Sequence, residues 1–204
     1  MLNIEKTNIQ IKNAKIKSHN IAMICYYFSK DYTAIQTASL IGCSRQTVNH
    51  YYKIFRTKIL EQNNLENFRK NKFLENQNLL EIKHINIYKH NIFYIQTIYG
   101  VFVLNNQNNI DLKLKDFIKD NLEVSLPKHK KANCARVLHS KQNDTYLISA
   151  YLKSDNILEE FLLSRLKKFR GINKNNFYSH LNESIFRYNN KNKNLYTKIL
   201  ETLN

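Results

Sequence analysis

Glycine and proline are almost absent from this chain, with three glycines and one proline among 204 residues. Because these two residue types most often interrupt regular structure, their scarcity predicts long, uninterrupted helices. Each glycine then marks a break in the pattern. Gly42 separates two helical segments, Gly100 interrupts a region rich in strand-forming residues, and Gly171 follows an amphipathic helix.

The first 60 residues predict three helices. In residues 15–30 the apolar side chains that recur at helical spacing are Ile21, Ile24, Cys25 and Phe28. Asp31 or Thr33 suits the N-cap of a second helix, which is expected to end at Gly42. Ser44 suits the N-cap of a third helix. The residues that this helix is expected to bury are Val48, Tyr51, Tyr52, Phe55 and Ile59.

The residues around Gly42 favour a helix-turn-helix. Its first helix needs a small residue at the close approach, and its turn needs a residue that tolerates positive φ. Ala38 and Gly42 lie four residues apart, as this geometry requires. The second helix of such a motif enters the major groove. The expected base-contacting residues are Arg45, Gln46, Asn49 and His50, and the expected capping or phosphate-contacting residues are Ser44, Thr47, Lys53 and Arg56. The alternative is a three-helix core whose exposed face is merely polar.

The charge of the chain favours a polyanionic partner. The formal net charge is +16, with 32 Lys and Arg against 16 Asp and Glu. Such an excess suits nucleic acid or an anionic membrane, because each bound phosphate releases counterions. We predict double-stranded DNA as the partner and no small-molecule substrate. A basic membrane-surface protein is the less favoured alternative, because the apolar residues have the spacing of a core.

The sequence predicts a cytoplasmic protein that does not span a membrane. No apolar run reaches the ~18 residues that a membrane span needs, and the first residues lack the apolar core of a secretory signal. Cys25, Cys43 and Cys134 lie far apart, without a Cys-x-x-Cys pair. We therefore expect reduced, mostly buried thiols, and neither a zinc site nor a disulfide framework.

After a polar connector, the composition of the chain changes and strand-forming residues become frequent. Strands are expected within Leu80–Leu104 and Tyr146–Ala150, and the expected helices are Lys113–Leu122, Ile157–Phe169, Asn175–Tyr188 and a short one at the C-terminus. Between them, Lys128–Lys141 is basic, contains no acidic residue and is expected to be irregular. The charges at Lys128–Lys131 and Arg165–Arg170 are either contacts to the DNA backbone or solvated surface.

The C-terminal segment Arg165–Leu200 resembles the end of a family of small bacterial insertion-sequence transposases. The strings that carry the resemblance are Lys168–Phe169–Arg170–Gly171–Ile172, Asn176–Phe177–Tyr178, His180–Leu181, Phe186–Arg187–Tyr188–Asn189 and Asn194–Leu195–Tyr196. Arg136–Val137–Leu138–His139–Ser140 and the N-terminal segment 33–58 are also similar to that family.

This resemblance implies an RNase-H-like core that cuts and joins DNA strands with two Mg²⁺ ions. Such a site needs acidic or amide ligands that hold the two ions ~3.5–4 Å apart. The candidate ligands here are Glu81, Asp116, Asp120 and Asn156. Lys83 stands where the family has its first metal-binding aspartate, and Asn156 stands where it has its third acid. The departures imply an impaired or absent catalytic centre, with Mg²⁺ expected only if activity remains.

Together these patterns predict an α+β fold. The expected domains are a helix-turn-helix three-helix domain at 1–62, a connector at 63–78, and a reduced RNase-H-like mixed α/β core with C-terminal helices at 79–204. The expected function is that of a transposase-family DNA-binding protein of an insertion sequence. The alternative is a helix-turn-helix transcription regulator domesticated from a transposase, with the C-terminal region forming a homodimer. His139 and Ser140 resemble a base and a nucleophile, but no orienting acid accompanies them in the sequence.

Overall fold

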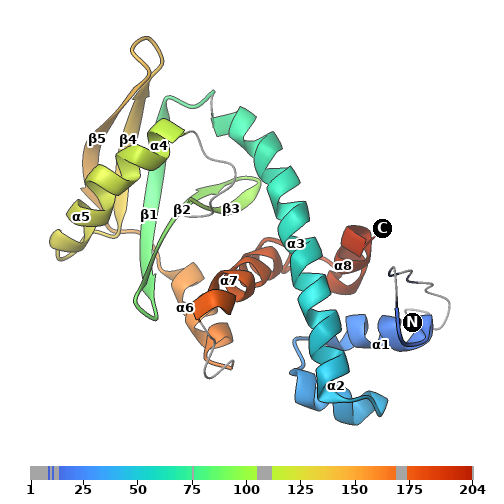
Figure 1. The fold of residues 1–204 in the computed structure, drawn as a ribbon. Helices are drawn as coiled ribbons and strands as arrows, with labels where there is room; N and C mark the ends of the chain where they lie inside the picture. The colour runs from blue at the N-terminus through green and yellow to red at the C-terminus, as the bar shows by residue number, and fades with distance from the viewer. Residues whose placement is uncertain are drawn as a thin grey trace. The chain divides into compact units, whose positions relative to one another are not determined.

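The computed structural model describes residues 9, 11, 14–74, 76–104, 112–168 and 174–203, with the side chains of 64–74, 174 and 175 left outside the description. The chain divides into two compact units (Figure 1). The first, here called the terminal unit, combines Met1–Asn63 with Asn173–Asn204. The second, here called the sheet unit, is Asn64–Ile172.

The terminal unit is built from helices of both chain ends. Its elements are α1 (Ser18–Ser29), α2 (Ala34–Ile41), the first part of α3 (Arg45–Leu74), α7 (Lys174–Asn189) and α8 (Leu195–Leu203). Every residue predicted for the core of the first three helices is buried, and Val48, Phe55 and Ile59 are completely inaccessible. Phe186 and Tyr196 from the C-terminal helices belong to the same apolar cluster.

These units divide the chain differently from the predicted domains 1–62, 63–78 and 79–204. The C-terminal helices belong with the N-terminal ones and not with the sheet, because their apolar faces bury Phe186, Tyr196 and Ile199 in the core of the terminal unit. Most of the expected connector continues the third helix, since α3 runs to Leu74.

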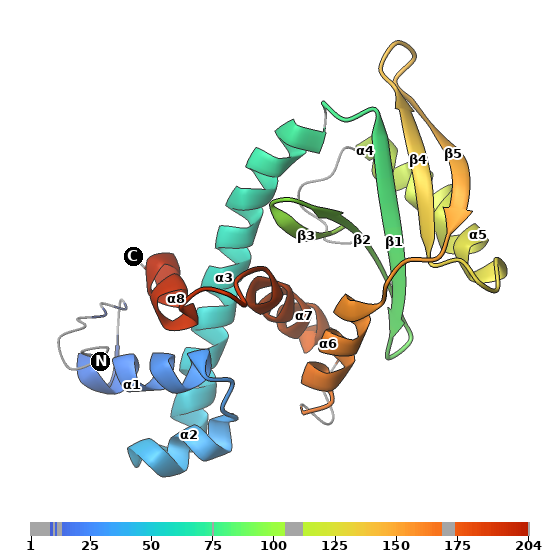
Figure 2. The ribbon, with the colours of Figure 1, turned by 180° about the vertical axis from the view of Figure 1, so that it is seen from behind.

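The sheet unit contains a five-stranded sheet in the order β3-β2-β1-β4-β5. Its strands are β1 (Leu79–Ile87), β2 (His90–Thr97), β3 (Gly100–Val103), β4 (Cys134–Ser140) and β5 (Thr145–Leu152). All neighbouring strands pair antiparallel. Figure 2 shows the same sheet from behind. The predicted strands in Leu80–Leu104 and Tyr146–Ala150 are confirmed, and the α+β class is confirmed with them.

One face of the sheet is covered by a helical segment. It consists of α4 (Leu112–Phe117), a π-helical stretch η2 (Ile118–Leu122), α5 (Glu123–Ser125) and a 3-10 turn η3 (Leu126–Lys128). In both views α4 and α5 lie across β4 and β5 (Figures 1 and 2). The core of this face joins Leu114, Ile118 and Leu122 of the helical segment to Leu80 and Ile82 of β1.

One expectation for the sheet unit is wrong, and another is confirmed only in part. The stretch Lys128–Lys141 is not irregular throughout, because Cys134–Ser140 forms β4 between β1 and β5. This strand was not predicted from the sequence, because its short apolar pattern lies within a stretch rich in basic residues. The predicted helix from Ile157 is present as α6 (Ile157–Leu166), whereas the predicted stop at Gly171 lies outside the described residues.

Among the described helices, none is long and apolar enough to cross a membrane.

Candidate nucleic-acid interface

The turn between α2 and α3 is defined by three local interactions. Thr33 forms a capping box with Gln36, in which the Thr33 side chain accepts from the Gln36 N–H and Gln36 accepts from the Thr33 N–H. At the other end, Gly42 adopts a left-handed conformation with φ 72°, and its N–H donates to the Ala38 carbonyl. The Ser44 hydroxyl then accepts from the Thr47 N–H at the start of α3. Each cap satisfies backbone groups that a helix end leaves unpaired.

A buried polar contact fixes α2 against α3. The Tyr52 hydroxyl donates to the Tyr32 carbonyl at 3.0 Å, so the 2.7 Å bond to Thr37 uses the Thr37 hydroxyl as donor. Thr37 is completely inaccessible and Tyr52 is nearly so. Burial raises the pKa of Tyr52 to about 12, which keeps this hydroxyl protonated and able to donate. The contact therefore holds the two helices in one register.

Gly42 is expected to matter through its backbone alone. A Cβ added at this position would meet no atom within 4 Å, so only the left-handed φ opposes a side chain. We expect Gly42→Val to lower the free energy of unfolding by about 1–2 kcal/mol in urea denaturation. Gly42→Asn is the control and should lose less, because asparagine tolerates this conformation. Equal stability of the valine variant and the wild type would contradict the left-handed turn.

The first turns of α3 carry an exposed polar face. It consists of Arg45, Gln46, Asn49, His50 and Lys53, all exposed and spaced as one stripe of a helix. Within the described part of the chain, none of these five side chains has an ion-pair or hydrogen-bond partner. Residues 32–60 also contain no aspartate or glutamate. The α3 face therefore presents unengaged donors and positive charge.

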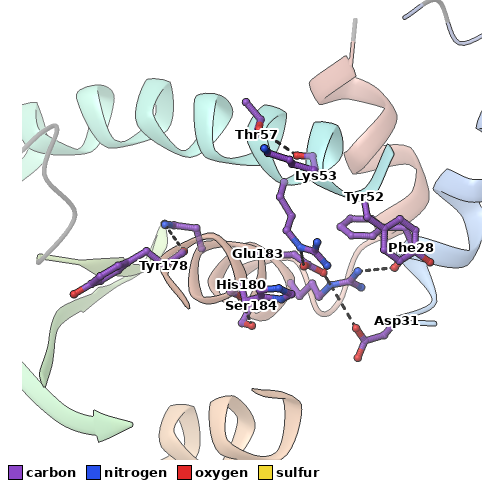
Figure 3. A network of polar contacts seen from close by, with 12 residues as sticks. Phe28, Asp31, Tyr52, Lys53, Thr57, Tyr178, His180, Glu183 and Ser184 are labelled. Atoms are coloured by element: carbon purple, nitrogen blue, oxygen red, sulfur yellow. Dashed lines mark hydrogen bonds and ion pairs between the residues drawn. The ribbon is translucent and has the colours of Figure 1, made fainter. Parts of the chain in front are cut away.

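Behind this face, a buried carboxylate joins α3 to α7. Glu183 of α7 has a side chain only 1% exposed, and its two oxygens accept from different arginines. Arg56 of α3 donates at 2.7 Å and Arg187 of α7 at 2.8 Å. Figure 3 shows Glu183 below α3 within this network. A buried ionic cluster of this kind adds little stability by itself but fixes the geometry of the groups that form it.

Arg187 extends the network to the end of α1. Its guanidinium donates to the carbonyl of Phe28 at 2.5 Å and to that of Ser29 at 3.0 Å, and it lies 4.9 Å from the centre of the Phe28 ring. These carbonyls belong to the last turn of α1, where the helix leaves carbonyls without their usual partners, and that of Phe28 also accepts from the Asp31 N–H at 3.0 Å. The arginine therefore acts as a C-terminal cap. One side chain of α7 thus fixes both α1 and, through Glu183, α3.

The structure corrects one predicted contact. Arg56 was expected to bind a phosphate, but its side chain is only 13% exposed and is bonded to Glu183. We therefore leave Arg56 out of the α3 face and assign it to the packing of α3. The sequence offered one signal for this role, because Glu183 and Arg187 lie four residues apart among the buried apolar positions of one helix.

The expected metal ligands of the sheet unit do not come together. Glu81 is paired with Arg136, which lies directly opposite on β4 and donates to it at 2.9 Å. Asp116 and Asp120 are exposed on the helical segment that covers the face formed by Leu80 and Ile82. Successive side chains of a strand point to opposite faces. Glu81 and the two aspartates are therefore separated by the sheet.

The fourth candidate is engaged elsewhere. Asn156 precedes α6, and its side-chain oxygen accepts from the amide of Asn133. Within the described residues, no group of three or more His, Cys, Asp or Glu side chains could hold a metal ion. The residues present do not fit the two-Mg²⁺ site that the resemblance implies, and we derive no cleavage step from them.

His139 has an acidic partner that the sequence did not reveal. Its ring Nε2–H donates to the Asp144 carboxylate at 3.1 Å, and the ring stacks on Tyr146 with ring centres 4.6 Å apart. Asp144 is also bonded to Lys113, which is the main cause that lowers the pKa of this carboxyl. Ser140 follows His139 in β4 and points to the other face. The two side chains therefore do not form a nucleophile and base.

Comparison with known proteins adds no relative to this description: no family model, no curated protein and no solved structure matches the chain.

Proposed function

We propose that the protein binds double-stranded DNA sequence-specifically through the terminal unit, with α2, the turn at Gly42 and α3 acting as a helix-turn-helix. The α3 face enters the major groove, where Arg45 suits guanine and Gln46 or Asn49 suits adenine. In this proposal Lys53 and the hydroxyls of Ser44 and Thr47 contact phosphates.

A single observation carries this proposal. Five exposed side chains of types that can contact bases or phosphates lie in one stripe on α3, without a hydrogen-bond or ion-pair partner in the described chain. The alternative of a polar surface on a three-helix core gives no reason for the absence of carboxylates in residues 32–60. Exposed helices of ordinary solvated surfaces mix both signs of charge, whereas a DNA-reading helix excludes acids because phosphates repel them.

We also propose that the protein is related to insertion-sequence transposases. The sequence resemblance implies an insertion-sequence transposase with an RNase-H-like core, and the separation of Glu81 from Asp116 and Asp120 supports a member that binds DNA without metal-dependent strand cleavage. A transcription regulator derived from such a transposase has the same terminal unit. Selection of bound fragments from the source genome separates the two. Binding to inverted repeats beside its own gene favours the mobile element, and binding within promoters favours the regulator.

Arg45→Ala tests the reading function directly. If Arg45 contacts guanine, affinity for the selected site falls by about 1–3 kcal/mol, while affinity for unrelated duplexes changes much less. Fluorescence anisotropy with the selected and a scrambled duplex measures both values. Lys58→Ala is the matched control, because Lys58 lies on the same helix and is already paired with Glu61. An equal loss on both duplexes would make Arg45 a phosphate contact.

A further inference from the structure

The basic loop Lys128–Lys131 of the sheet unit presents a second array of positive charge. All four of its residues are exposed, and three of them are lysines. Lys153, just after the end of β5, is also exposed. In the part of the chain that the structure describes, no ion pair is formed by Lys128, Lys130, Lys131 or Lys153. The nearest acids along the chain are Glu123 and Asp155, and within the described residues neither forms an ion pair with these lysines.

The loop is held in place by its own backbone. The His129 N–H donates to the Leu126 carbonyl, and the Ala132 N–H donates to the His129 carbonyl at 2.8 Å. Leu126 is completely buried in the core of the sheet unit. The His129 ring stacks on Tyr151 of β5, with ring centres 3.9 Å apart. The lysines therefore project from a fixed turn.

Asn133 ties the same loop to the segment that carries Lys153. Its N–H donates to the Leu152 carbonyl at 3.0 Å, and its side-chain oxygen accepts from the Ser154 N–H at 2.7 Å. Its own carbonyl accepts from the His84 N–H of β1. Asn133 and Lys153 thus share one end of the β4–β5 pair. Lys131 lies two residues before Asn133, so the loop leads directly to the end of the β4–β5 pair that also carries Lys153.

Holding several like charges together costs free energy unless a polyanion neutralises them. We propose that the basic loop, together with Lys153, is a sequence-independent contact for the phosphate backbone of duplex DNA. This inference rests on the proposed DNA-binding function and adds a second point of attachment in the other unit. A membrane surface fits less well, because binding there combines charge with inserted apolar side chains, and no apolar residue interrupts the sequence from Lys128 to Lys131.

The test uses the full chain and two triple variants of equal charge. The loop variant is Lys128→Gln, Lys130→Gln and Lys131→Gln. The control is Lys89→Gln, Lys115→Gln and Lys119→Gln, which removes three charges from the β1–β2 turn and the helical segment of the same unit. Affinity for the selected and the scrambled duplex is measured at several salt concentrations. We expect the loop variant to lose affinity for both duplexes by the same factor. The slope of log K against log salt should become shallower by about 2–3, while the control stays near the wild-type slope.

The outcomes separate this inference from the proposed function. If the wild type prefers its selected site but the loop variant keeps the wild-type slope, the inference is overturned and the proposed function stands. If the wild type shows no sequence preference and the loop substitutions still weaken binding, the proposed sequence recognition by the α3 face is wrong and the inference stands. Loss of binding to anionic lipid vesicles, with DNA binding unchanged, would overturn the inference in favour of a membrane contact.

Discussion

A chain that ends at Ile172 is expected to lose the fold of the terminal unit and, with it, the proposed sequence-specific DNA binding. The removed helices supply Phe186, Tyr196 and Ile199 to the core that contains α1 and α3. Burial of each such side chain contributes roughly 1.5–3 kcal/mol, and the total stability of a domain is only about 5–15 kcal/mol. Circular dichroism and limited proteolysis of residues 1–62 within the truncated chain measure the loss.

Substitutions in the full chain separate the loss of one buried side chain from the removal of two whole helices. Ile199→Ala leaves the chain length unchanged and is expected to cost about 2–5 kcal/mol, as a large side chain is removed from a fully buried site. Thr197→Ala, at an exposed position of the same helix, is the control and should cost little. If the chain ending at Ile172 kept the unfolding transition and the DNA affinity of the wild type, the assignment of α7 and α8 to this core would be wrong.

Glu183→Gln is expected to lower the free energy of unfolding by about 3–5 kcal/mol, because breaking a buried ion pair leaves uncompensated charge. The amide has nearly the same size, so packing is preserved while Arg56 and Arg187 lose their shared carboxylate. Since Arg56 lies on α3 directly after the α3 face, DNA affinity should fall together with stability. Urea denaturation and anisotropy measure the two effects.

The matched control for this variant is Glu201→Gln. Glu201 also lies on a helix of the terminal unit and pairs with Lys198, but its side chain is 54% exposed. Exposed pairs contribute about 0–1 kcal/mol, so this substitution should be nearly silent. A loss of less than 1 kcal/mol for Glu183→Gln, similar to that of the control, would show that the buried network does not hold α3 in place.

Much of the local structure was predictable from short-range rules. The capping box at Thr33, the left-handed stop at Gly42 and the cap at Ser44 follow from interactions between residues three to five positions apart. Helical periodicity likewise identified the buried residues of α1 and α3. The exposed residues of the α3 face were found in the same way, because a helix that buries one stripe must expose the opposite one.

The candidate catalytic site could not be predicted to the same extent. Glu81, Asp116 and Asp120 were named from the resemblance, by matching residue type and position along the chain, and neither says on which face of the sheet each residue lies. The pairing of β1 with β4 turns Glu81 toward Arg136, and the packing of Ile118 places the aspartates over the other face. His139 and Asp144 meet because β4 and β5 form a hairpin. This hairpin was not predicted from the sequence, because the basic stretch that contains β4 was expected to be irregular.

The sequence alone thus determined the cap at Ser44, the turn at Gly42 and the polar stripe of α3, since each depends on neighbours within about one helical turn. For the second helix it left Asp31 and Thr33 as candidate caps, and the structure selects Thr33. Only the tertiary structure decided that α7 and α8 complete the N-terminal core, and that Arg56 is bonded to Glu183, 127 residues away. No spacing rule reaches so far. The partner of a buried charge or an apolar face depends on which distant segments the whole fold brings together, because burial is gained wherever complementary surfaces meet.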